Sequence, residues 1–387
     1  MFKLSERVRT LPPYLFAELD RKKEEVIQRG IDVIDLGVGD PDLPTPPYIV
    51  KAMEREIRKG ENHCYPSYLG TIEFRTAVAQ WYLERFNVRL DPVHEVIALI
   101  GSKEGIAHFP FAFVEQGDIV LVSDPGYPVY QVSTKFAGGE AYPLPLKREN
   151  DFLPDYSSIP AKVRKKARLL FINYPNNPTA GVATKKFFRE TARFARENGI
   201  IVCHDAAYTE IFYGSYVPPS FLQLPGSKKV GIEFHSLSKT FNMTGWRIGF
   251  AAGNRELVKG LGKIKTNIDS GVFTAIQKAG IAALKKGDGS VKKLRNVYRK
   301  RRDILVKGLI EGGFSPILPR ASFYVWMPVP EGMTSSGFAS ALLEDAGVVC
   351  TPGVGFGGSG EGYVRFSLTV NEKRLKEAAE RIGLLNF

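Results

Sequence analysis

Ser236-Leu237-Ser238-Lys239-Thr240 is followed closely by Met243-Thr244-Gly245-Trp246-Arg247-Ile248-Gly249. A lysine amine can form a Schiff base with an aldehyde, and serine hydroxyls with an arginine can hold a phosphate by hydrogen bonds and charge. Because the chain has 53 Lys and Arg, most of its lysines are expected to be solvated surface charges. What singles out Lys239 is the set of groups beside it. Together they indicate a lysine that carries a phosphorylated aldehyde, and pyridoxal 5'-phosphate (PLP) is such a molecule.

The bulk composition predicts a globular protein of two or three domains. The 387 residues are 44% hydrophobic, and a prior of ~150 residues per domain gives that range. No apolar run reaches the ~18 residues of a transmembrane helix, and the N-terminus does not resemble a signal peptide. Three cysteines that form no CxxC pair favour a reduced, cytoplasmic setting.

The net charge of +12 raises nucleic-acid binding as an alternative. However, the basic residues are scattered or mixed with acids, and the densest runs, 162–168 and 295–302, are typical of solvated helix faces or strand approaches. Charge alone does not supply an element that reads a groove, so we expect no nucleic-acid partner. The histidines show no metal spacing such as HExxH, so we expect no metal site.

Short apolar segments alternate with amphipathic ones through the middle of the chain. Because the apolar segments are apolar on both faces, they resemble strands of a covered parallel sheet. We expect strands at 96–100, 119–123, 168–173, 200–204, 232–235 and 248–252, and helices at 103–115, 185–198 and 256–264. This alternation predicts an α/β domain with a mostly parallel sheet.

The two ends of the chain have a different pattern. A long charged helix is expected at 291–311, then strands at 322–327, 348–350 and 363–368 with helices near 336–344 and 372–382, which predicts a smaller α+β domain. The first 45 residues hold one expected helix, 14–30, and are too few for their own core. We therefore expect an N-terminal arm with part of the small domain (1–45), a large PLP-binding domain (46–285) and a small C-terminal domain (286–387).

Four further motifs follow predicted strands, at the edge where open parallel sheets bind ligands. Gly101-Ser102-Lys103-Glu104-Gly105 could present backbone N–H groups to a phosphate at a helix start. Asp124-Pro125-Gly126-Tyr127-Pro128 places an aromatic ring that could stack on a planar heterocycle. Each motif by itself is more simply an ordinary turn.

The other two motifs offer polar groups to such a heterocycle. Asn173-Tyr174-Pro175-Asn176-Asn177-Pro178-Thr179 carries a turn signal, and its two adjacent asparagines can donate to a phenolate oxygen. In Cys203-His204-Asp205-Ala206-Ala207-Tyr208, a carboxylate ends an apolar strand and requires a cationic partner. A protonated pyridine nitrogen is such a partner, although Asp205 alone would be interpreted as a helix cap. Tyr208 could reach the phenolic oxygen.

In this order and with these gaps, the motifs resemble those of the class I and II aminotransferases, PLP-dependent enzymes of fold type I. The resemblance extends from about Ile34 to Leu368. It implies an α/β fold whose large domain has a mostly parallel seven-stranded sheet covered by helices, beside a smaller α+β domain. It also implies a homodimer that acts on an amino acid and a 2-oxo acid by ping-pong transfer.

The resemblance further implies a role for each matched cofactor residue. Lys239 would form the internal aldimine and then move protons, Asp205 would pair with the pyridine nitrogen, and Tyr127 would stack on the ring. Asn177 and Tyr208 would bind the ring oxygen. The phosphate would be surrounded by Ser102, Lys103, Ser236, Ser238 and Arg247, with Tyr65 reaching it from the neighbouring subunit.

The substrate residues follow in the same way. Arg365, in Tyr363-Val364-Arg365-Phe366-Ser367, would clamp the substrate α-carboxylate with a bidentate fork. The backbone of Gly39 would contact the same carboxylate. Tyr127 and Asn177 would touch substrate as well as cofactor.

Longer segments narrow the resemblance to LL-diaminopimelate aminotransferases. The similar segments are 11–23, 61–68, 100–108 and 236–247. They imply substrate contacts from Tyr14 and Lys103, and a lysine-biosynthesis reaction in which LL-diaminopimelate and 2-oxoglutarate are interconverted with tetrahydrodipicolinate, glutamate and water. The chain departs from many relatives at Ala180, where they have Gly, and at Phe241, where they have Tyr.

Two alternatives stay open at this point. Aspartate, alanine, aromatic or methionine transamination would use the same cofactor residues. A PLP-binding regulator without catalysis is less favoured, because the residues ahead of the large domain show no helix-turn-helix pattern.

Overall fold

The computed structural model describes residues 2–11 and 15–385. Its largest element is a seven-stranded sheet with the strand order β2-β8-β7-β6-β5-β3-β4. Only β8 runs antiparallel to its neighbours, so the predicted mostly parallel sheet is confirmed. The strands of this sheet are β2 (Val96–Leu99), β3 (Ile119–Asp124), β4 (Glu140–Pro145), β5 (Ala167–Asn173), β6 (Ile201–Asp205), β7 (Gly231–Ser236) and β8 (Gly249–Gly253).

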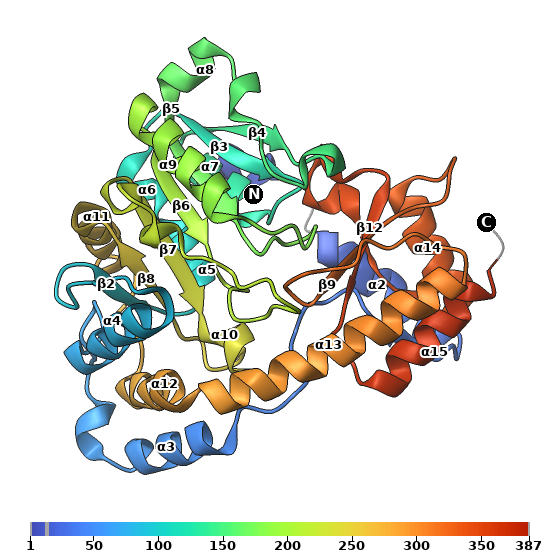
Figure 1. Ribbon diagram of the computed structural model, residues 1–387, viewed down its shortest axis with the longest axis horizontal. Coiled ribbons are helices and arrows are strands. Elements are labelled where there is room, and N and C mark those ends of the chain that lie inside the picture. The colour runs from blue at the N-terminus through green and yellow to red at the C-terminus, as the bar shows by residue number, and fades with distance from the viewer. Residues whose placement is uncertain (1, 12–14, 386–387) are drawn as a thin grey trace.

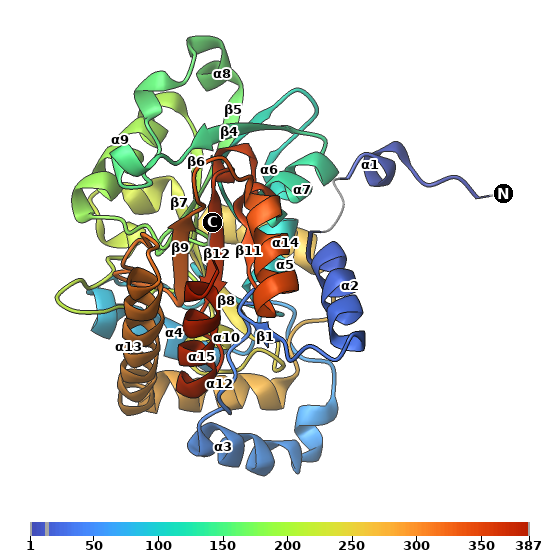
Figure 2. The ribbon, with the colours of Figure 1, turned by 90° about the vertical axis from the view of Figure 1, so that its right-hand side faces the viewer.

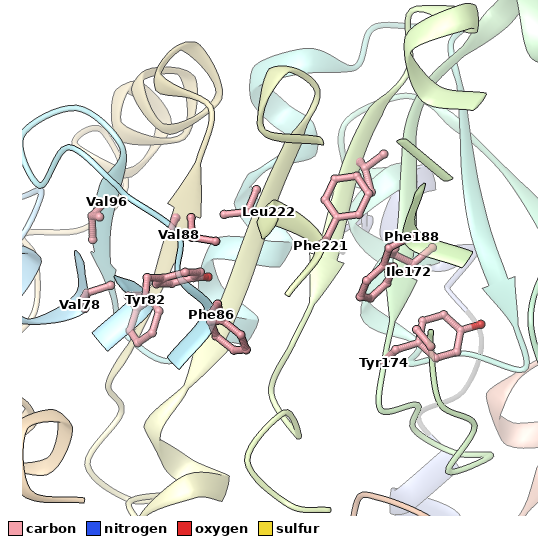
Figure 3. Packing of buried hydrophobic residues seen from close by; sticks show 14 of the residues in the cluster. Val78, Tyr82, Phe86, Val88, Val96, Ile172, Tyr174, Phe188, Phe221 and Leu222 are labelled. Atoms are coloured by element: carbon pink, nitrogen blue, oxygen red, sulfur yellow. The ribbon is translucent and has the colours of Figure 1, made fainter. Parts of the chain in front are cut away.

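Helices cover both faces of this sheet (Figure 1). One face packs against α3 (Pro47–Ile57), α4 (Ile72–Phe86), α9 (Lys185–Asn198) and α12 (Thr274–Lys286). The other face packs against α5 (Ser102–His108), α7 (Val129–Phe136) and α11 (Arg255–Lys265). Alternate residues of each strand enter the two cores, so both faces are apolar, as the sequence pattern predicts. Figure 3 shows side chains of the first core, among them Tyr82, Phe188 and Phe221.

The expected helix at 103–115 is divided in two. α5 ends at His108, and α6 (Pro110–Phe113) begins at a proline, which cannot donate the backbone hydrogen bond that a continuous helix needs. The sequence pattern also did not single out α3, α4, α12 or β4. β4 is an edge strand that contains two prolines, Pro143 and Pro145, and prolines are tolerated at an edge.

The second body of the molecule is built on a small antiparallel sheet of order β11-β12-β9. Its elements are α13 (Asp288–Glu311), β9 (Tyr324–Pro328), α14 (Ser335–Ala346), β10 (Val348–Val349), β11 (Thr351–Pro352), β12 (Tyr363–Ser367) and α15 (Glu372–Gly383). The expected single strand at 348–350 is wrong, because the structure has two short strands in this region. β10 pairs with β1 (Ile34–Asp35), whereas β11 pairs with β12. Figure 1 shows α13 running from beside α12 to α15.

The N-terminal segment packs on this smaller body. β1 pairs with β10, and Val26 of α2 (Leu15–Gln28) joins Leu343 and Val349 in a small apolar cluster. Figure 2 shows α1 (Glu6–Arg9) set apart from both sheets. The predicted domain boundaries at 45/46 and 285/286 stay predictions.

Short elements complete the described chain. α8 (Ala161–Lys166) precedes β5, and α10 (Leu237–Thr240) follows β7. The 3₁₀ turns are Gly60–His63, Arg148–Asn150, Tyr156–Ser158, Phe221–Gln223, Ser227–Lys229, Gly353–Phe356 and Gly358–Gly360. Over the described residues, every helix is too short or too polar to traverse a bilayer.

A buried polar cluster lies within the first core, behind β6 and β7. Glu233 accepts hydrogen bonds from His204 Nδ1 at 2.7 Å, from Ser220 Oγ at 2.6 Å and from the Phe221 backbone at 2.6 Å. The other ring nitrogen of His204 faces the carbonyl of Tyr174 at 2.9 Å. Both ring nitrogens of His204 therefore face acceptors in the core. His204, one residue before Asp205 in β6, therefore belongs to the core.

Candidate active site

The sheet edge carries a cavity of about 490 Å³, at the carboxyl ends of β2, β3, β5, β6 and β7. Segments far apart in sequence meet there, because the carboxyl ends of parallel strands share one edge. The predicted site residues that line it are Gly39, Ser102, Lys103, Tyr127, Asn177, Asp205, Tyr208, Ser236, Ser238, Lys239, Arg247 and Arg365. A larger surface hollow of about 1060 Å³, beside α9, contains none of them. Tyr14 lies outside the described residues.

Lys239 lies in α10, directly after β7. Ser236 caps this helix, since its hydroxyl accepts a hydrogen bond from the Ser238 backbone at 3.2 Å. The Lys239 amine donates to the carbonyl of Gly39 at 2.9 Å. Burial lowers the pKa of Lys239 to about 8, and Arg247 and Arg365 act in the same direction. A larger neutral fraction makes the amine a better nucleophile toward an aldehyde.

One end of the cavity is suited to a phosphate. Ser236 and Ser238 line the cavity together with Ser102, at the start of α5, and with Arg247. Arg247 donates to the carbonyl of Thr244 at 2.9 Å, which orients the guanidinium. Gly101 has φ +75, and a Cβ there would overlap the Arg247 guanidinium. Glycine is therefore required by both the backbone angle and the close approach.

Asp205 also lines the cavity, from the last position of β6. Its carboxylate is buried and accepts from the Tyr130 hydroxyl at 2.8 Å and from the Ala207 backbone at 3.3 Å. Burial raises the pKa of Asp205, and these hydrogen bonds oppose the rise. A carboxylate in this setting is stabilised by a cation placed in the cavity. Tyr130 also contacts Tyr127 edge-on, at 5.9 Å between ring centres.

Arg365 reaches the cavity from β12 of the smaller body. Its guanidinium donates to Asn177 Oδ1 at 2.7 Å and to the carbonyl of Gly37 at 2.6 Å. It lies 4.2 Å from the Tyr324 ring centre and 4.7 Å from that of Phe356. Arg365 Nε is buried and has no hydrogen-bond partner among the described residues. Burial lowers the pKa of Arg365.

The two predicted asparagines have different roles. Asn177 faces the cavity, whereas Asn176 is buried in the turn and accepts from Thr179 at 2.8 Å. Asn173 lines the cavity instead, accepting from the Asn177 backbone at 2.7 Å and donating to the Asp205 carbonyl at 2.7 Å. The Asn173 side chain therefore fixes the position of two other site residues.

Tyr65 lies outside this cavity and is 89% exposed. Its neighbours Tyr68, Leu69 and Ile72 are also exposed. The single chain therefore does not bring Tyr65 to the other predicted residues.

Sequence reasoning missed Tyr130, Tyr324 and Phe356. Tyr130 follows Tyr127 by one helical turn, and that spacing is a signal that could have found it. Tyr324 and Phe356 belong to the smaller body, where no sequence pattern pointed to the cavity.

One cluster beside the site has the composition of a metal site. Ligand atoms of Glu104, His108 and Asp269 lie within 4.8 Å of one another. The buried ammonium of Lys265 lies 3.4 Å from Glu104 and 2.8 Å from Asp269. Lysine therefore already supplies a cation to both carboxylates.

Comparison with known proteins places this site in a family. Residues 31–382 match the family described as aminotransferase class I and II. An LL-diaminopimelate aminotransferase from Aquifex aeolicus is 59% identical over 387 residues, covering 100% of both chains. A protein of the same name from Syntrophobacter fumaroxidans is 56% identical, also over 100% of both chains.

Solved structures share the fold as well. The apo structure of BacF from Bacillus subtilis matches with a TM-score of 0.96 and 37% identity, covering 100% of this chain and 99% of that one. An aspartate aminotransferase variant from Thermus thermophilus matches with a TM-score of 0.92 and 30% identity, covering 99% of both. With the cavity, its lysine and its two arginines assembled as described, the chain belongs to the class I and II aminotransferases.

Proposed function

We propose that the chain binds PLP in the 490 Å³ cavity and transfers an amino group between LL-diaminopimelate and 2-oxoglutarate, with tetrahydrodipicolinate, glutamate and water on the other side of the reaction. The observation that carries the proposal is the meeting of Lys239, Asp205 and Arg365 in that one cavity. These three supply an amine for an aldehyde, an anion for a pyridinium and a fork for a carboxylate.

The donors and acceptors of the cavity fit PLP from end to end. The phosphate would lie among Ser102, Lys103, Ser236, Ser238 and Arg247. Asp205 would hold a proton on the pyridine nitrogen, Tyr127 would stack on the ring, and Asn177 and Tyr208 would donate to the ring oxygen. When bound, PLP supplies a ring that withdraws electrons from the substrate's Cα.

Lys239 would act on the proton of the substrate. The lowered pKa of its amine, about 8, leaves more of it unprotonated near neutral pH. An unprotonated Nζ can take a proton from the substrate's Cα and return it at a neighbouring carbon. The hydrogen bond to the Gly39 carbonyl keeps this amine inside the cavity until it reacts.

Arg365 would bind the substrate α-carboxylate, assisted by the backbone of Gly39. The guanidinium stays in place because two of its nitrogens already donate to Asn177 and Gly37. Lys103, whose amine lies 5.9 Å from the Tyr127 ring centre, offers a cation near both phosphate and substrate. The names of the full-length relatives, at 56–59% identity, support LL-diaminopimelate as the substrate.

The exposed face around Tyr65 supports a homodimer. Tyr65, Tyr68, Leu69, Ile72 and Ile268 are all exposed apolar residues. The loops that carry them adjoin, since a Cβ on Gly271 would lie 2.8 Å from the Ser67 carbonyl. Covering this face with a second copy would bury the apolar area and would bring Tyr65 to the phosphate end of the partner's cavity.

A half-reaction screen tests the substrate. The PLP-loaded protein is mixed with one amino acid at a time, and the loss of its yellow colour is followed as the cofactor takes up the amino group. We expect LL-diaminopimelate and glutamate to bleach the protein fastest. Faster bleaching by aspartate, alanine, methionine or an aromatic amino acid would assign the other substrate, and a colourless protein would reject PLP binding.

A hybrid dimer tests Tyr65. Lys239→Ala and Tyr65→Ala chains are each expected to be defective alone. Mixed and allowed to exchange, they form one site with Lys239 from one chain and Tyr65 from the other, so activity should return. Failure to regain activity in hybrids verified as dimers would remove Tyr65 from the partner's site.

A further inference from the structure

Tyr324 contacts two site residues whose proposed roles are separate. It begins β9, and its side chain is buried. Its hydroxyl lies 3.0 Å from the hydroxyl of Tyr208, and its ring lies 4.2 Å from the Arg365 guanidinium. Tyr208 follows β6 of the large sheet, whereas Arg365 lies in β12 next to β9. Tyr324 therefore joins the two bodies at the cavity.

The hydrogen bond between the two tyrosines has only one possible direction when the site is loaded. A phenol has one hydrogen to donate and two lone pairs to accept. If Tyr208 donates to the ring oxygen of PLP, its own oxygen can only accept from Tyr324. Burial raises the pKa of both tyrosines, so both keep the hydrogen that this chain of bonds requires.

The position of the Tyr324 hydroxyl is tightly restricted. A Cβ on Gly39 would overlap it, so the absence of a side chain at Gly39 makes room for the hydroxyl. The charged groups that act on Tyr324 are Arg365, in contact with the ring, and Asp205 and Asp40. The positive charge of Arg365 polarises the phenol and makes its hydroxyl a stronger donor.

We propose that Tyr324 is a positioning residue with two separable actions: its ring holds the Arg365 fork in the plane that meets the substrate carboxylate, and its hydroxyl fixes Tyr208 as a donor to the cofactor's ring oxygen. This inference rests on the proposed function. Tyr324 would connect the Arg365 substrate site to the cofactor. A substrate carboxylate that neutralises Arg365 would also weaken the polarisation of the Tyr324 hydroxyl.

Two substitutions separate the two actions. Tyr324→Phe keeps the ring under Arg365 and removes only the hydroxyl, whereas Tyr324→Leu removes both. Tyr363→Phe is the matched control, because it removes a hydroxyl from the same small sheet, where the Tyr363 ring stacks on Trp326 at 5.2 Å.

The first readout is the pH midpoint of the absorbance change of bound PLP, which reports the proton on the nitrogen that links PLP to Lys239. The hydrogen bond from Tyr208 to the ring oxygen disperses the negative charge that favours this proton. Because loss of the Tyr324 hydroxyl would weaken that hydrogen bond, it should raise the pH midpoint, by about 0.5–1 pH unit for one hydrogen bond. We expect this shift in Tyr324→Phe and no shift in Tyr363→Phe.

The second readout is the dissociation constant of 2-methylglutamate, an amino acid that carries an α-carboxylate but has no Cα proton to lose. Tyr324→Phe should bind it like the wild type. Tyr324→Leu should bind it about tenfold more weakly, because an Arg365 side chain that is no longer held by the ring must be ordered when the carboxylate binds.

If Tyr324→Phe has the wild-type pH midpoint, the hydroxyl does not position Tyr208 as a donor. If Tyr324→Phe binds 2-methylglutamate more weakly than the wild type, the hydroxyl also affects the Arg365 fork and the two actions are not separable. Wild-type affinity in Tyr324→Leu would overturn the action of the ring. If the leucine variant does not fold, the phenylalanine variant still decides the first two points. Failure of the proposed function is distinct from these outcomes, because the wild-type protein would then show no PLP absorbance to titrate.

Discussion

Replacing Arg365 by lysine tests the proposed substrate clamp in the most direct way. Lysine keeps the charge but presents one ammonium instead of a planar fork. The substitution loses one charge-assisted hydrogen bond to the substrate carboxylate, about 1.5–3 kcal/mol. The ring contact with Tyr324, at 4.2 Å, exists with and without substrate, so its loss adds nothing to this figure. The lost hydrogen bond alone predicts a fall in kcat/KM of about 10- to 150-fold, at 1.4 kcal/mol for each factor of ten.

The assay is steady-state kinetics with the amino donor and the 2-oxo acceptor varied in turn. Both substrates carry the carboxylate that Arg365 would bind, so kcat/KM should fall by a similar factor for both. The fold should survive, because the Gly37 carbonyl still accepts from the Thr351 hydroxyl at 2.9 Å; thermal unfolding of the variant is the control. A wild-type kcat/KM for either substrate in the folded variant would refute the assignment of Arg365.

Three further predictions follow from the same contacts. Lys239→Ala should abolish transamination while circular dichroism shows an intact fold; near-wild-type turnover would reject Lys239 as the reactive amine. Asp205→Asn should lower kcat at least about 30-fold, since breaking a buried charge pair costs about 2 kcal/mol or more; a mild effect would argue against the pyridinium pairing. Glu233→Gln should lower the free energy of unfolding by about 1–3 kcal/mol at neutral pH, because the amide NH2 cannot accept from the buried donors that now bind one carboxylate oxygen. Burial alone would raise the pKa of Glu233, but its interactions with His204 and, at 3.9 Å, with His235 outweigh burial and lower the pKa. The stabilisation is therefore full above the ordinary pKa of 4.5 and lost as the pH falls below it. Urea unfolding at several pH values measures this, and a difference from wild type that does not shrink in acid would contradict the role of the Glu233 carboxylate.

The sequence predicted the large sheet well because each of its covered strands is apolar on both faces. Six of the strands in the seven-stranded sheet were anticipated within a residue or two, and the missed one is the proline-containing edge strand β4. α3, α4 and α12 were missed although they pack on the sheet. Helices of mixed polarity are harder to delimit from a sequence than short apolar strands bounded by turns.

The contents of the cavity were also largely predictable, because reactive groups follow strand ends that must share an edge. Lys239, Asp205 and the Ser102 turn are all positions of this kind. Arg365 was placed only through the family resemblance. It reaches the site because β12 pairs with β9 in a separate sheet, and local sequence patterns do not encode that pairing between distant segments.

By itself, the amino-acid sequence determined the chemical groups available to this protein: an amine in a short helix after β7, a carboxylate at the end of β6 and a cluster of phosphate donors. Only the tertiary structure decided which neighbours act on those groups. One such neighbour is Tyr130, which donates to Asp205. Another is Tyr324, which contacts both Tyr208 and Arg365. These contacts form between elements that fold against each other. Such contacts depend on how helices and sheets pack, and packing is a property of the whole chain.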